Sequence, residues 1–291
     1  MSDTEKMGSR ELGLVLTQQI LGVDDLHYGL WDDAMELKLA NLHIAQQRYT
    51  DNLINAMPDP KAGSVKVFDI GCGTGHVLGQ LLARGFEADG LVPAPSLAKL
   101  VRQQQAKYPN YPSKLYECIF EAVPVGEMQQ KYDVCLFSES FQYICMETSF
   151  DILQKILKPG GIVVICDFFK TEHHGDGGPG DGSFGGGHAM ADFYRKVQAS
   201  RFEIARDEDI TQRVSPNLQL VNDILHNTIK PVGLTFDRYL SENYPKIYWV
   251  IKRLVRKKLE RLNYKYFEGH RNKETFERYK TYHLIVLKLK G

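Results

Sequence analysis

The sequence predicts an α/β fold in which a doubly wound, mainly parallel sheet is covered by helices on both faces. From Val65 onward, short runs rich in β-branched residues alternate with longer helical patterns, which is typical of βαβ units. The apolar run at Val67 leads into the glycine-rich turn of VFDIGCGTGHVLG and then into a helix pattern. A length of 291 residues, 43% of them hydrophobic, suits one such domain with an appendage.

The strands and helices are expected in the alternating order of this fold class. Strands are predicted at Val65–Ile70, Ala88–Val92, Leu115–Phe120, Val134–Phe137 and Gly161–Phe168, and a final one at His283–Lys290. Helices are predicted at His76–Arg84, Ser96–Lys107 and Ser149–Leu157. The last of these helices should end at Lys158-Pro159-Gly160-Gly161, because proline cannot continue a helix and glycine accepts the turn.

Two segments of unusual composition precede the final strand. Gly175 to His188 is more than half glycine, which predicts a mobile segment, either a linker or a lid at the carboxyl edge of the sheet. Pro216 to Tyr279 is expected to be mostly helical. Within it, Lys246 to Lys273 carries ten Lys/Arg against two Glu around an apolar helical face. This pattern fits a docked helix with a solvated basic face, or a surface for anionic lipid or an acidic substrate.

The composition narrows the partners and the compartment. Formal net charge is zero and no nucleic-acid module is visible, which disfavours nucleic acid. No apolar stretch reaches about 20 residues, and MSDTEKMGSR lacks a signal peptide's apolar segment. A cytoplasmic location is expected, with contact at the inner face of a membrane left open. The five cysteines have no CxxC spacing and are expected to be free thiols.

The glycine turn predicts a nucleotide-containing cofactor. A helix N-terminus presents unpaired N–H groups and the positive end of a dipole. The dinucleotide fingerprint is G-x-G-x-x-G, but here Gly71, Gly73 and Gly75 are spaced by two, and His76 holds the place of the third glycine. A dinucleotide is therefore disfavoured.

The motif DIGCGTG resembles the first motif of class I S-adenosylmethionine-dependent methyltransferases. KYDVCLFSESFQYI (Lys131 to Ile144), LKPGGIVVICDFF (Leu157 to Phe169) and the final HLIVLKLK extend the resemblance over Val65 to Phe169 and the C-terminus. It implies a Rossmann-like, seven-stranded sheet whose last strand is antiparallel, with N-terminal helices and a helical insert before that strand. The implied activity is in-line methyl transfer from S-adenosyl-L-methionine to a small-molecule or lipid acceptor.

The same resemblance implies site residues. Asp69 would orient the glycine loop and the cofactor's amino end, and Gly71, Gly73 and Gly75 would let the backbone approach the methionine and ribose. Phe120 and Glu121 would border the adenine, while Ser138 and Glu139 would lie beside the sulfonium and the acceptor. The usual ribose-binding acid is replaced by Val92, and strand register makes neither Glu87 nor Asp89 an obvious substitute.

The N-terminal stretches HYGLWDD and AQQRYTDNLI resemble the segment that closes over the cofactor in cyclopropane-synthase-like and tocopherol-methyltransferase-like enzymes. This resemblance implies cofactor contacts by Tyr28 and by Gln46 or Gln47. An amphipathic helix packed on the sheet, with Tyr28 and Trp31 in the core, is an equal alternative.

A proton acceptor assists methyl transfer to a hydroxyl or ammonium nitrogen. Candidates near the carboxyl edge are Glu139, Asp167, His173, His174 and His188. His188 is preferred because it ends the glycine-rich segment, and Glu139 is second. No metal site is expected, because adjacent histidines on a flexible loop are poorly preorganised for zinc.

The expected organisation has three parts. Residues 1–60 form an N-terminal helical cap, residues 61–215 and 280–291 the cofactor-binding domain, and residues 216–279 a basic, acceptor-side insert. Two alternatives to methylation stay open. One is cyclopropanation or cyclisation of the cofactor, and the other is a non-catalytic membrane- or partner-binding protein on the same fold.

Overall fold

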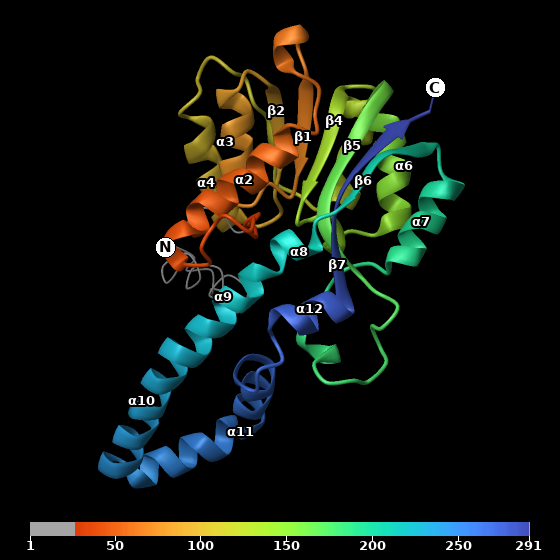
Figure 1. Cartoon of the computed structure of the whole chain (residues 1–291). Helices are drawn as coiled ribbons and strands as arrows, with labels where there is room; N and C mark the ends of the chain where they lie inside the picture. Colours follow the sequence, from red (N-terminus) through yellow and green to blue (C-terminus); the bar gives the residue numbers. More distant parts are fainter. Residues whose placement is uncertain (1–26, 291) are drawn as a thin grey trace.

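A computed structural model describes residues 27–290, except for the side chains of residues 62, 258, 261, 262 and 265. Its centre is a seven-stranded sheet in the order β3-β2-β1-β4-β5-β7-β6 (Figure 1). The strands are β1 (Lys66–Ile70), β2 (Glu87–Leu91), β3 (Leu115–Tyr116), β4 (Tyr132–Ser138), β5 (Leu157–Lys170), β6 (Phe202–Asp209) and β7 (Lys280–Leu289). The first five are parallel, and β7 runs antiparallel between β5 and β6, which confirms the predicted fold class.

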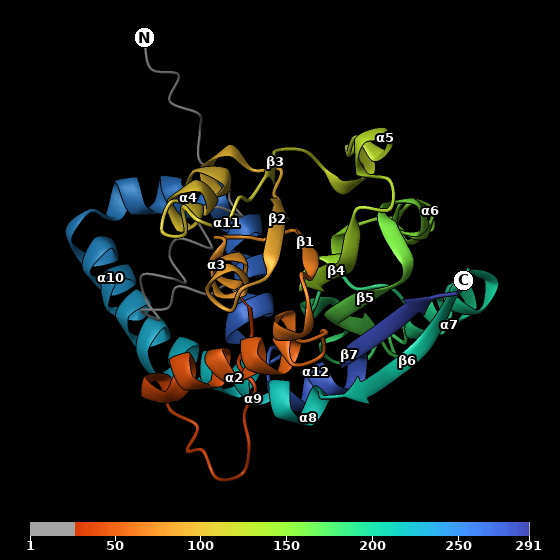
Figure 2. The ribbon, with the colours of Figure 1, turned by 90° about the horizontal axis from the view of Figure 1, so that it is seen from above.

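Helices cover both faces of the sheet, as Figure 2 shows from above. One face carries α2 (Leu42–Ile54), α3 (His76–Ala83) and α4 (Pro95–Gln105), and the other carries α5 (Val125–Met128), α6 (Met146–Ile156) and α7 (Met190–Ala199). Strand residues alternate between the two cores: Val67 packs in the first, whereas Phe68 packs in the second. Burial on both faces explains why the central strands β1 and β4 and most of β5 are nearly continuous apolar runs.

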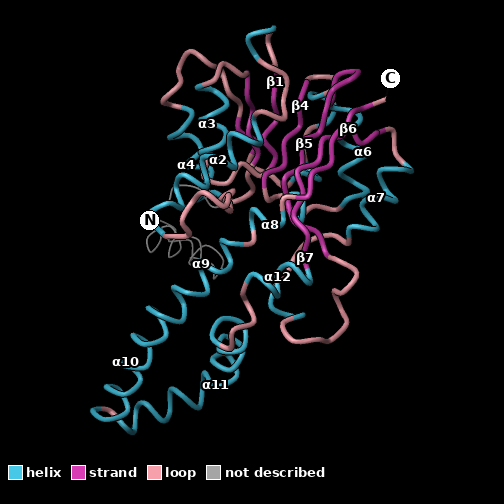
Figure 3. The backbone as a smooth tube through the Cα atoms, in the orientation of Figure 1, coloured by secondary structure: helices cyan, strands magenta, loops and turns pink. Residues whose placement is uncertain are grey.

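The helix α8 (Thr211–Val214) precedes the predicted insert. The insert is helical and contains α9 (Pro216–Ile224), a π-helical stretch at Leu225–Ile229, α10 (Lys230–Asn243), α11 (Pro245–Phe267) and α12 (Lys273–Tyr279). Figures 1 and 3 show α10 and α11 projecting from the carboxyl edge of the sheet as a helical arm. Short 3-10 turns lie at Leu39–Asn41, Pro60–Ala62, Phe120–Ala122, Phe141–Tyr143 and Asp181–Ser183. Between residues 27 and 290, no helix is long and apolar enough to cross a bilayer.

Most strand boundaries differ from the prediction by one to four residues; β5, for example, starts at Leu157 and not at Gly161. Two other boundaries show the reason. The third strand ends at Tyr116 and not at Phe120, because the chain turns into the 3-10 helix Phe120–Ala122, which buries Phe120. The final strand starts at Lys280 and not at His283, because β5 extends to Lys170 and offers partners to the three extra residues. Both boundaries depend on pairing across the sheet, for which local sequence carries little signal.

The glycine-rich segment, predicted to be a mobile linker or lid, makes specific contacts within itself and with α12. The backbone N–H groups of Gly175 and Gly177 donate to the Asp181 carboxylate at 2.9 and 3.3 Å. Phe184 is buried with its ring edge against Phe276, at a centroid distance of 5.3 Å. The Asp181 hydrogen bonds are internal to the segment, and the contact between Phe184 and Phe276 joins it to α12.

Candidate functional site

A cavity of about 230 Å³ opens at the carboxyl ends of β1 and β4. Ligands of open α/β sheets bind at such an edge because the loops that follow neighbouring strands diverge there. The cavity is lined by His27, Asp69, Gly71, Cys72, Gly73, Thr74, His76, Val77, Ser138, Glu139 and Tyr143. It therefore brings together five of the predicted site residues: Asp69, Gly71, Gly73, Ser138 and Glu139.

Asp69 supplies a buried carboxylate to this cavity. Its side chain is 1% exposed, and its Oδ2 atom has no hydrogen-bond partner in the described part of the chain. Burial raises the pKa of this carboxyl to about 7. A buried oxygen without a partner is costly, so this atom is suited to receive a donor from a bound molecule.

The glycine turn makes room beside Asp69. Gly73 has φ +55°, and a Cβ placed there would meet nothing within 4 Å, so the turn leaves open space on the cavity side. Gly75, the N-cap residue of α3, has φ +82°, and a Cβ there would lie 2.9 Å from the Val101 Cα of α4. His76 and Val77, in the first turn of α3, line the cavity, so the positive end of the helix dipole faces it.

Glu139 follows β4 in a left-handed conformation with φ 53°, an unfavourable one for a residue with a side chain. Its Oε1 accepts hydrogen bonds from the Tyr28 N–H and the Tyr282 hydroxyl, both at 2.8 Å. Burial raises the pKa of the Glu139 carboxyl, and His27 and the two donors offset part of this rise. The strained turn therefore presents a carboxyl group whose proton affinity is increased.

A chain of hydroxyl groups continues from Glu139 into the protein. The Tyr282 hydroxyl lies 3.1 Å from the Tyr49 hydroxyl, which lies 3.2 Å from Ser138 Oγ. His27 stacks on the Tyr49 ring at 4.3 Å between centroids. Sequence reasoning did not select His27, Tyr49 or Tyr282, although His27 opens the quoted HYGLWDD stretch.

The N-terminal segment reaches the cavity through His27. Tyr28 contacts Glu139 through its backbone, and its ring packs edge-on against Phe276 and Tyr282. Gln46 is buried, and its Nε2 donates to the His27 carbonyl at 2.8 Å. Neither Tyr28 nor Gln46 lines the cavity, so both hold the segment that does.

The predicted adenine and ribose positions lie outside this cavity. Val92 is a core residue of 2% exposure, and Phe120 packs against Phe68 and Phe137 in the core of the opposite face. Glu121 accepts a hydrogen bond from the Cys145 N–H at 3.2 Å. The cavity therefore lies at the glycine turn and at the end of β4, and the ends of β2 and β3 do not line it.

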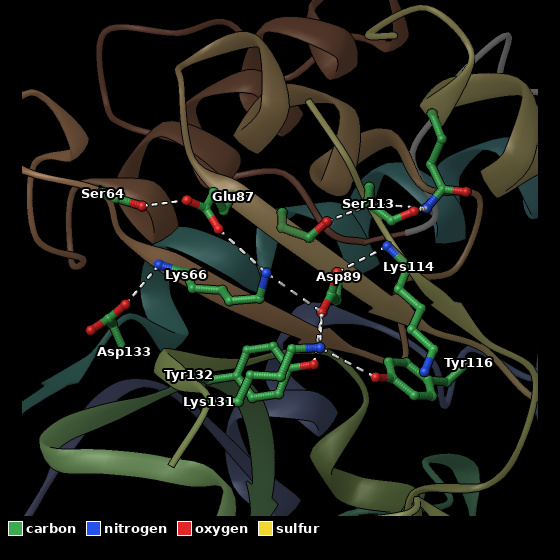
Figure 4. Close-up of polar contacts among 12 residues, drawn as sticks. Ser64, Lys66, Glu87, Asp89, Ser113, Lys114, Tyr116, Lys131, Tyr132 and Asp133 are labelled. Carbon is green, nitrogen blue, oxygen red and sulfur yellow. Dashed lines mark hydrogen bonds and ion pairs between the residues drawn. The ribbon is translucent and has the colours of Figure 1, made fainter. Parts of the chain in front are cut away.

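Neither acidic residue of β2 replaces the missing acid at Val92. Figure 4 shows Asp89 held by Lys131 at 2.8 Å, by the Tyr132 hydroxyl at 2.9 Å and by the Lys114 N–H at 2.9 Å. In the same figure Glu87 contacts Ser64 and Lys66. Both carboxylates are therefore already bound by neighbouring residues, at positions of β2 that precede its carboxyl end.

His188, the preferred catalytic base, does not line the cavity. Its Nε2 lies 3.0 Å from the Phe141 carbonyl oxygen, and its own carbonyl accepts from the Lys170 N–H at 2.8 Å. The glycine-rich segment holds His188 in this position.

Asp167, another candidate base, is buried, and burial raises its pKa to about 8. Its carboxylate accepts hydrogen bonds from the backbone N–H and the side-chain amide of Gln142. Within residues 27–290, no three His, Cys, Asp or Glu side chains gather as a metal site.

The chain resembles known proteins in both sequence family and fold. Residues 68–163 match the family described as "Methyltransferase domain". A comparison with curated protein sequences gives no match.

Three solved structures have the same overall fold at low sequence identity. A putative sarcosine dimethylglycine methyltransferase from Galdieria sulphuraria is 16% identical, with a TM-score of 0.69 over 95% of this chain and 97% of that one. Geranyl diphosphate C-methyltransferase from Streptomyces coelicolor A3(2), in complex with S-adenosyl-L-homocysteine, is 16% identical, with a TM-score of 0.63 over 94% and 92%. The [4+2]-cyclase SpnF is 17% identical, with a TM-score of 0.63 over 95% and 92%. Residues 68–163 are therefore similar to a methyltransferase-domain family, and the chain as a whole shares the fold of these three solved structures.

Proposed function

We propose that this protein binds S-adenosylmethionine in the cavity between Asp69 and Glu139 and transfers its methyl group to a small-molecule acceptor. The observation that carries the proposal is the buried, unpartnered Asp69 Oδ2 at the cavity wall. A carboxylate in this position suits the ammonium group of the cofactor's methionine portion. The methyltransferase family match over the same strand and turn supports this assignment.

The residues of the cavity fit the methionine half of that cofactor. Gly73 leaves room for it, and the first turn of α3 offers N–H groups to its carboxylate. The bound cofactor supplies an activated methyl group. The protein's task is then to align the acceptor and exclude water, and such positioning contributes on the order of 7–11 kcal/mol.

We assign the role of proton acceptor to Glu139. It lines the cavity next to Ser138, and its burial raises its pKa toward the range in which a carboxylate takes up a proton readily. The Tyr28 N–H and the Tyr282 hydroxyl fix the orientation of the carboxylate. The geometry favours Glu139 over His188, which would have to leave the Phe141 carbonyl to reach the cavity.

The remaining predicted contacts complete the proposal. The adenosine portion would pass the carboxyl ends of β2 and β3, near Val92, Phe120 and Glu121, without an acid for the ribose hydroxyls. Of the predicted cap at residues 1–60, residues 27–60 would cover the cofactor, and the rest of that prediction lies outside the described residues. Residues 61–215 and 280–290 would bind the cofactor, and residues 216–279 would meet the acceptor. We place the protein in the cytoplasm and propose an amphiphilic or lipid-like acceptor, because exposed aromatic residues are concentrated on the insert.

The proposal is tested by isothermal titration calorimetry with S-adenosylmethionine and S-adenosylhomocysteine. The wild type is expected to bind both, and Gly73→Leu is expected to bind neither, because its side chain enters the cavity. Gly85→Leu is the matched control: it also introduces a side chain at positive φ into open space, but at the far end of α3. Absence of binding by the wild type, or equal binding by the two variants, would contradict the proposal.

A second outcome on the same fold is exemplified by SpnF, described as a [4+2]-cyclase. SpnF has this fold, and in this chain Val92 replaces the usual ribose-binding acid. A reaction other than methylation is therefore the alternative. Mass spectrometry of the products separates the cases. Methylthioadenosine marks cyclisation of the cofactor, whereas S-adenosylhomocysteine accompanies both methylation and cyclopropanation, which the mass of the acceptor product then distinguishes.

A further inference from the structure

The arm formed by α10 and α11 exposes an unusual amount of apolar surface. None of the residues of α10 is buried, and Phe236 on this helix is 64% exposed. On α11, Trp249 is 62% exposed and Leu254 is 79% exposed. Single exposed apolar side chains are common, but many of them gathered on one projecting element mark an interaction site.

The apolar side chains of α11 are gathered on one face. Ile247, Val250, Ile251 and Leu254 follow the spacing of adjacent helical turns, and each is about half exposed or more. The side of α11 that meets α10 is a different one: the Tyr248 hydroxyl donates to the Asp237 carboxylate at 2.7 Å. The face of Leu254 therefore has no covering element in the described chain.

Cations flank this apolar face. Lys246, Arg253 and Lys257 are exposed, and no acidic partner is found for them among the described residues, whereas Lys252 pairs with Asp237 and Arg256 with Glu260. Helix α11 holds eight Lys/Arg and one Glu, a formal charge of +7, although the whole chain has a net charge of zero. The positive charge is therefore concentrated on the arm.

The charge identifies the occupant of the apolar face. Pairing of two copies through this face would bring two helices of charge +7 together, which is electrostatically unfavourable. Nucleic acid would neutralise the cations but would leave the apolar side chains in water. An anionic bilayer satisfies both, because apolar and aromatic side chains enter the headgroup boundary while Lys and Arg contact the phosphates.

We propose that the α10–α11 arm docks the protein onto an anionic membrane surface. Helix α11 lies in the plane of the interface with the face of Ile247 and Leu254 inward. The arm is joined to the carboxyl edge of the sheet by α9 and α12, where Asn217 bonds to Gly29 and Phe276 packs on Tyr28 (Figure 1). Docking thus places the cavity edge on the membrane side, which suits delivery of an amphiphilic acceptor.

The test is flotation of the full chain with vesicles of phosphatidylcholine alone or mixed with phosphatidylglycerol. The wild type is expected to float with the mixed vesicles at low salt, and to float less as salt rises. Each basic residue near an anionic surface strengthens partitioning by roughly fivefold. The triple variant Lys246→Gln, Arg253→Gln, Lys257→Gln should therefore lose about a hundredfold.

The matched control replaces three exposed lysines elsewhere, Lys61→Gln, Lys99→Gln and Lys155→Gln, and should float nearly as the wild type does. The apolar variant Ile247→Ser, Ile251→Ser, Leu254→Ser should lose flotation while its melting curve stays unchanged, because these side chains are exposed. Failure of the wild type to float with mixed vesicles, or equal losses in control and arm variants, overturns the proposal.

Sedimentation of the same proteins tests the competing occupant. A wild-type dimer that dissociates in the apolar variant, without vesicle binding, would assign the face to a second copy and overturn the membrane proposal. Calorimetry with S-adenosylmethionine on each variant reports the cofactor site separately. The two measurements can therefore contradict the membrane proposal and the cofactor proposal separately.

Discussion

Asp69→Asn isolates the buried carboxylate on which the cofactor assignment depends. Burial raises the Asp69 pKa from its ordinary value of 3.8 to about 7. Between these values the unfolded chain is ionised at this residue while the folded chain stays protonated. The folded state then binds more protons, so the free energy of unfolding falls as pH rises through this window. Three pKa units correspond to about 4 kcal/mol.

The variant cannot ionise and should lack this part of the pH dependence. Denaturant unfolding at about pH 4 and about pH 8 should show Asp69→Asn gaining about 4 kcal/mol relative to the cofactor-free wild type across the window. Wild-type affinity for S-adenosylmethionine should rise with pH through about 7, as Asp69 ionises. The variant should bind more weakly by about 1.5–3 kcal/mol, because a charge-assisted hydrogen bond is lost.

Asp33→Asn is the control, since Asp33 is exposed and distant from the cavity lining. It should follow the wild type in both measurements. Parallel pH profiles of the unfolding free energy for Asp69→Asn and the wild type would refute the assignment of a raised pKa to this residue. Unchanged affinity in Asp69→Asn would refute its contact with the cofactor.

Three further predictions concern other contacts. Tyr282→Phe removes a hydrogen-bond donor to Glu139 and should lower the free energy of unfolding by about 1 kcal/mol. NMR titration should show a higher pKa for Glu139, and an unchanged pKa would contradict the hydrogen bond. Asp89→Asn should cost about 2–3 kcal/mol. In the wild type, burial raises the Asp89 pKa, but Lys131 and the other donors more than offset it, so this stabilisation should be lost as pH falls through the lowered pKa; equal acid profiles would argue against it. Phe184→Ala should cost about 3 kcal/mol or more and speed proteolysis of the glycine-rich segment; unchanged cleavage would show that this ring does not anchor it.

Much of the fold and the centre of the site follow from local patterns. Apolar runs on either side of a glycine turn specify a strand, a turn and a helix whatever the rest of the chain does. The resemblance of this turn and of the end of β4 to methyltransferase motifs then implied Asp69, Gly73 and Glu139 as site residues. Their meeting at one edge follows from the parallel order of β1 and β4.

Other features depend on contacts between distant residues. Tyr28 and Tyr282 meet Glu139 across 111 and 143 residues, and no periodicity in the sequence reports such a meeting. His188 looked suited to move because it ends a glycine-rich segment, yet Phe184 packs on Phe276 and Asp176 pairs with Arg278, which joins that segment to α12. Glycine content describes the freedom of a chain before packing, and packing then removes it.

The sequence by itself determined the doubly wound sheet, the cofactor turn and the basic amphipathic pattern of α11, because each arises from residues close together in the chain. Only the tertiary structure decided which side chains enclose the cavity, that Val92 lies in the core, and that the apolar face of α11 is exposed. The physical reason is that periodicity shows that a helix has an apolar face, whereas burial of that face depends on where the rest of the chain packs.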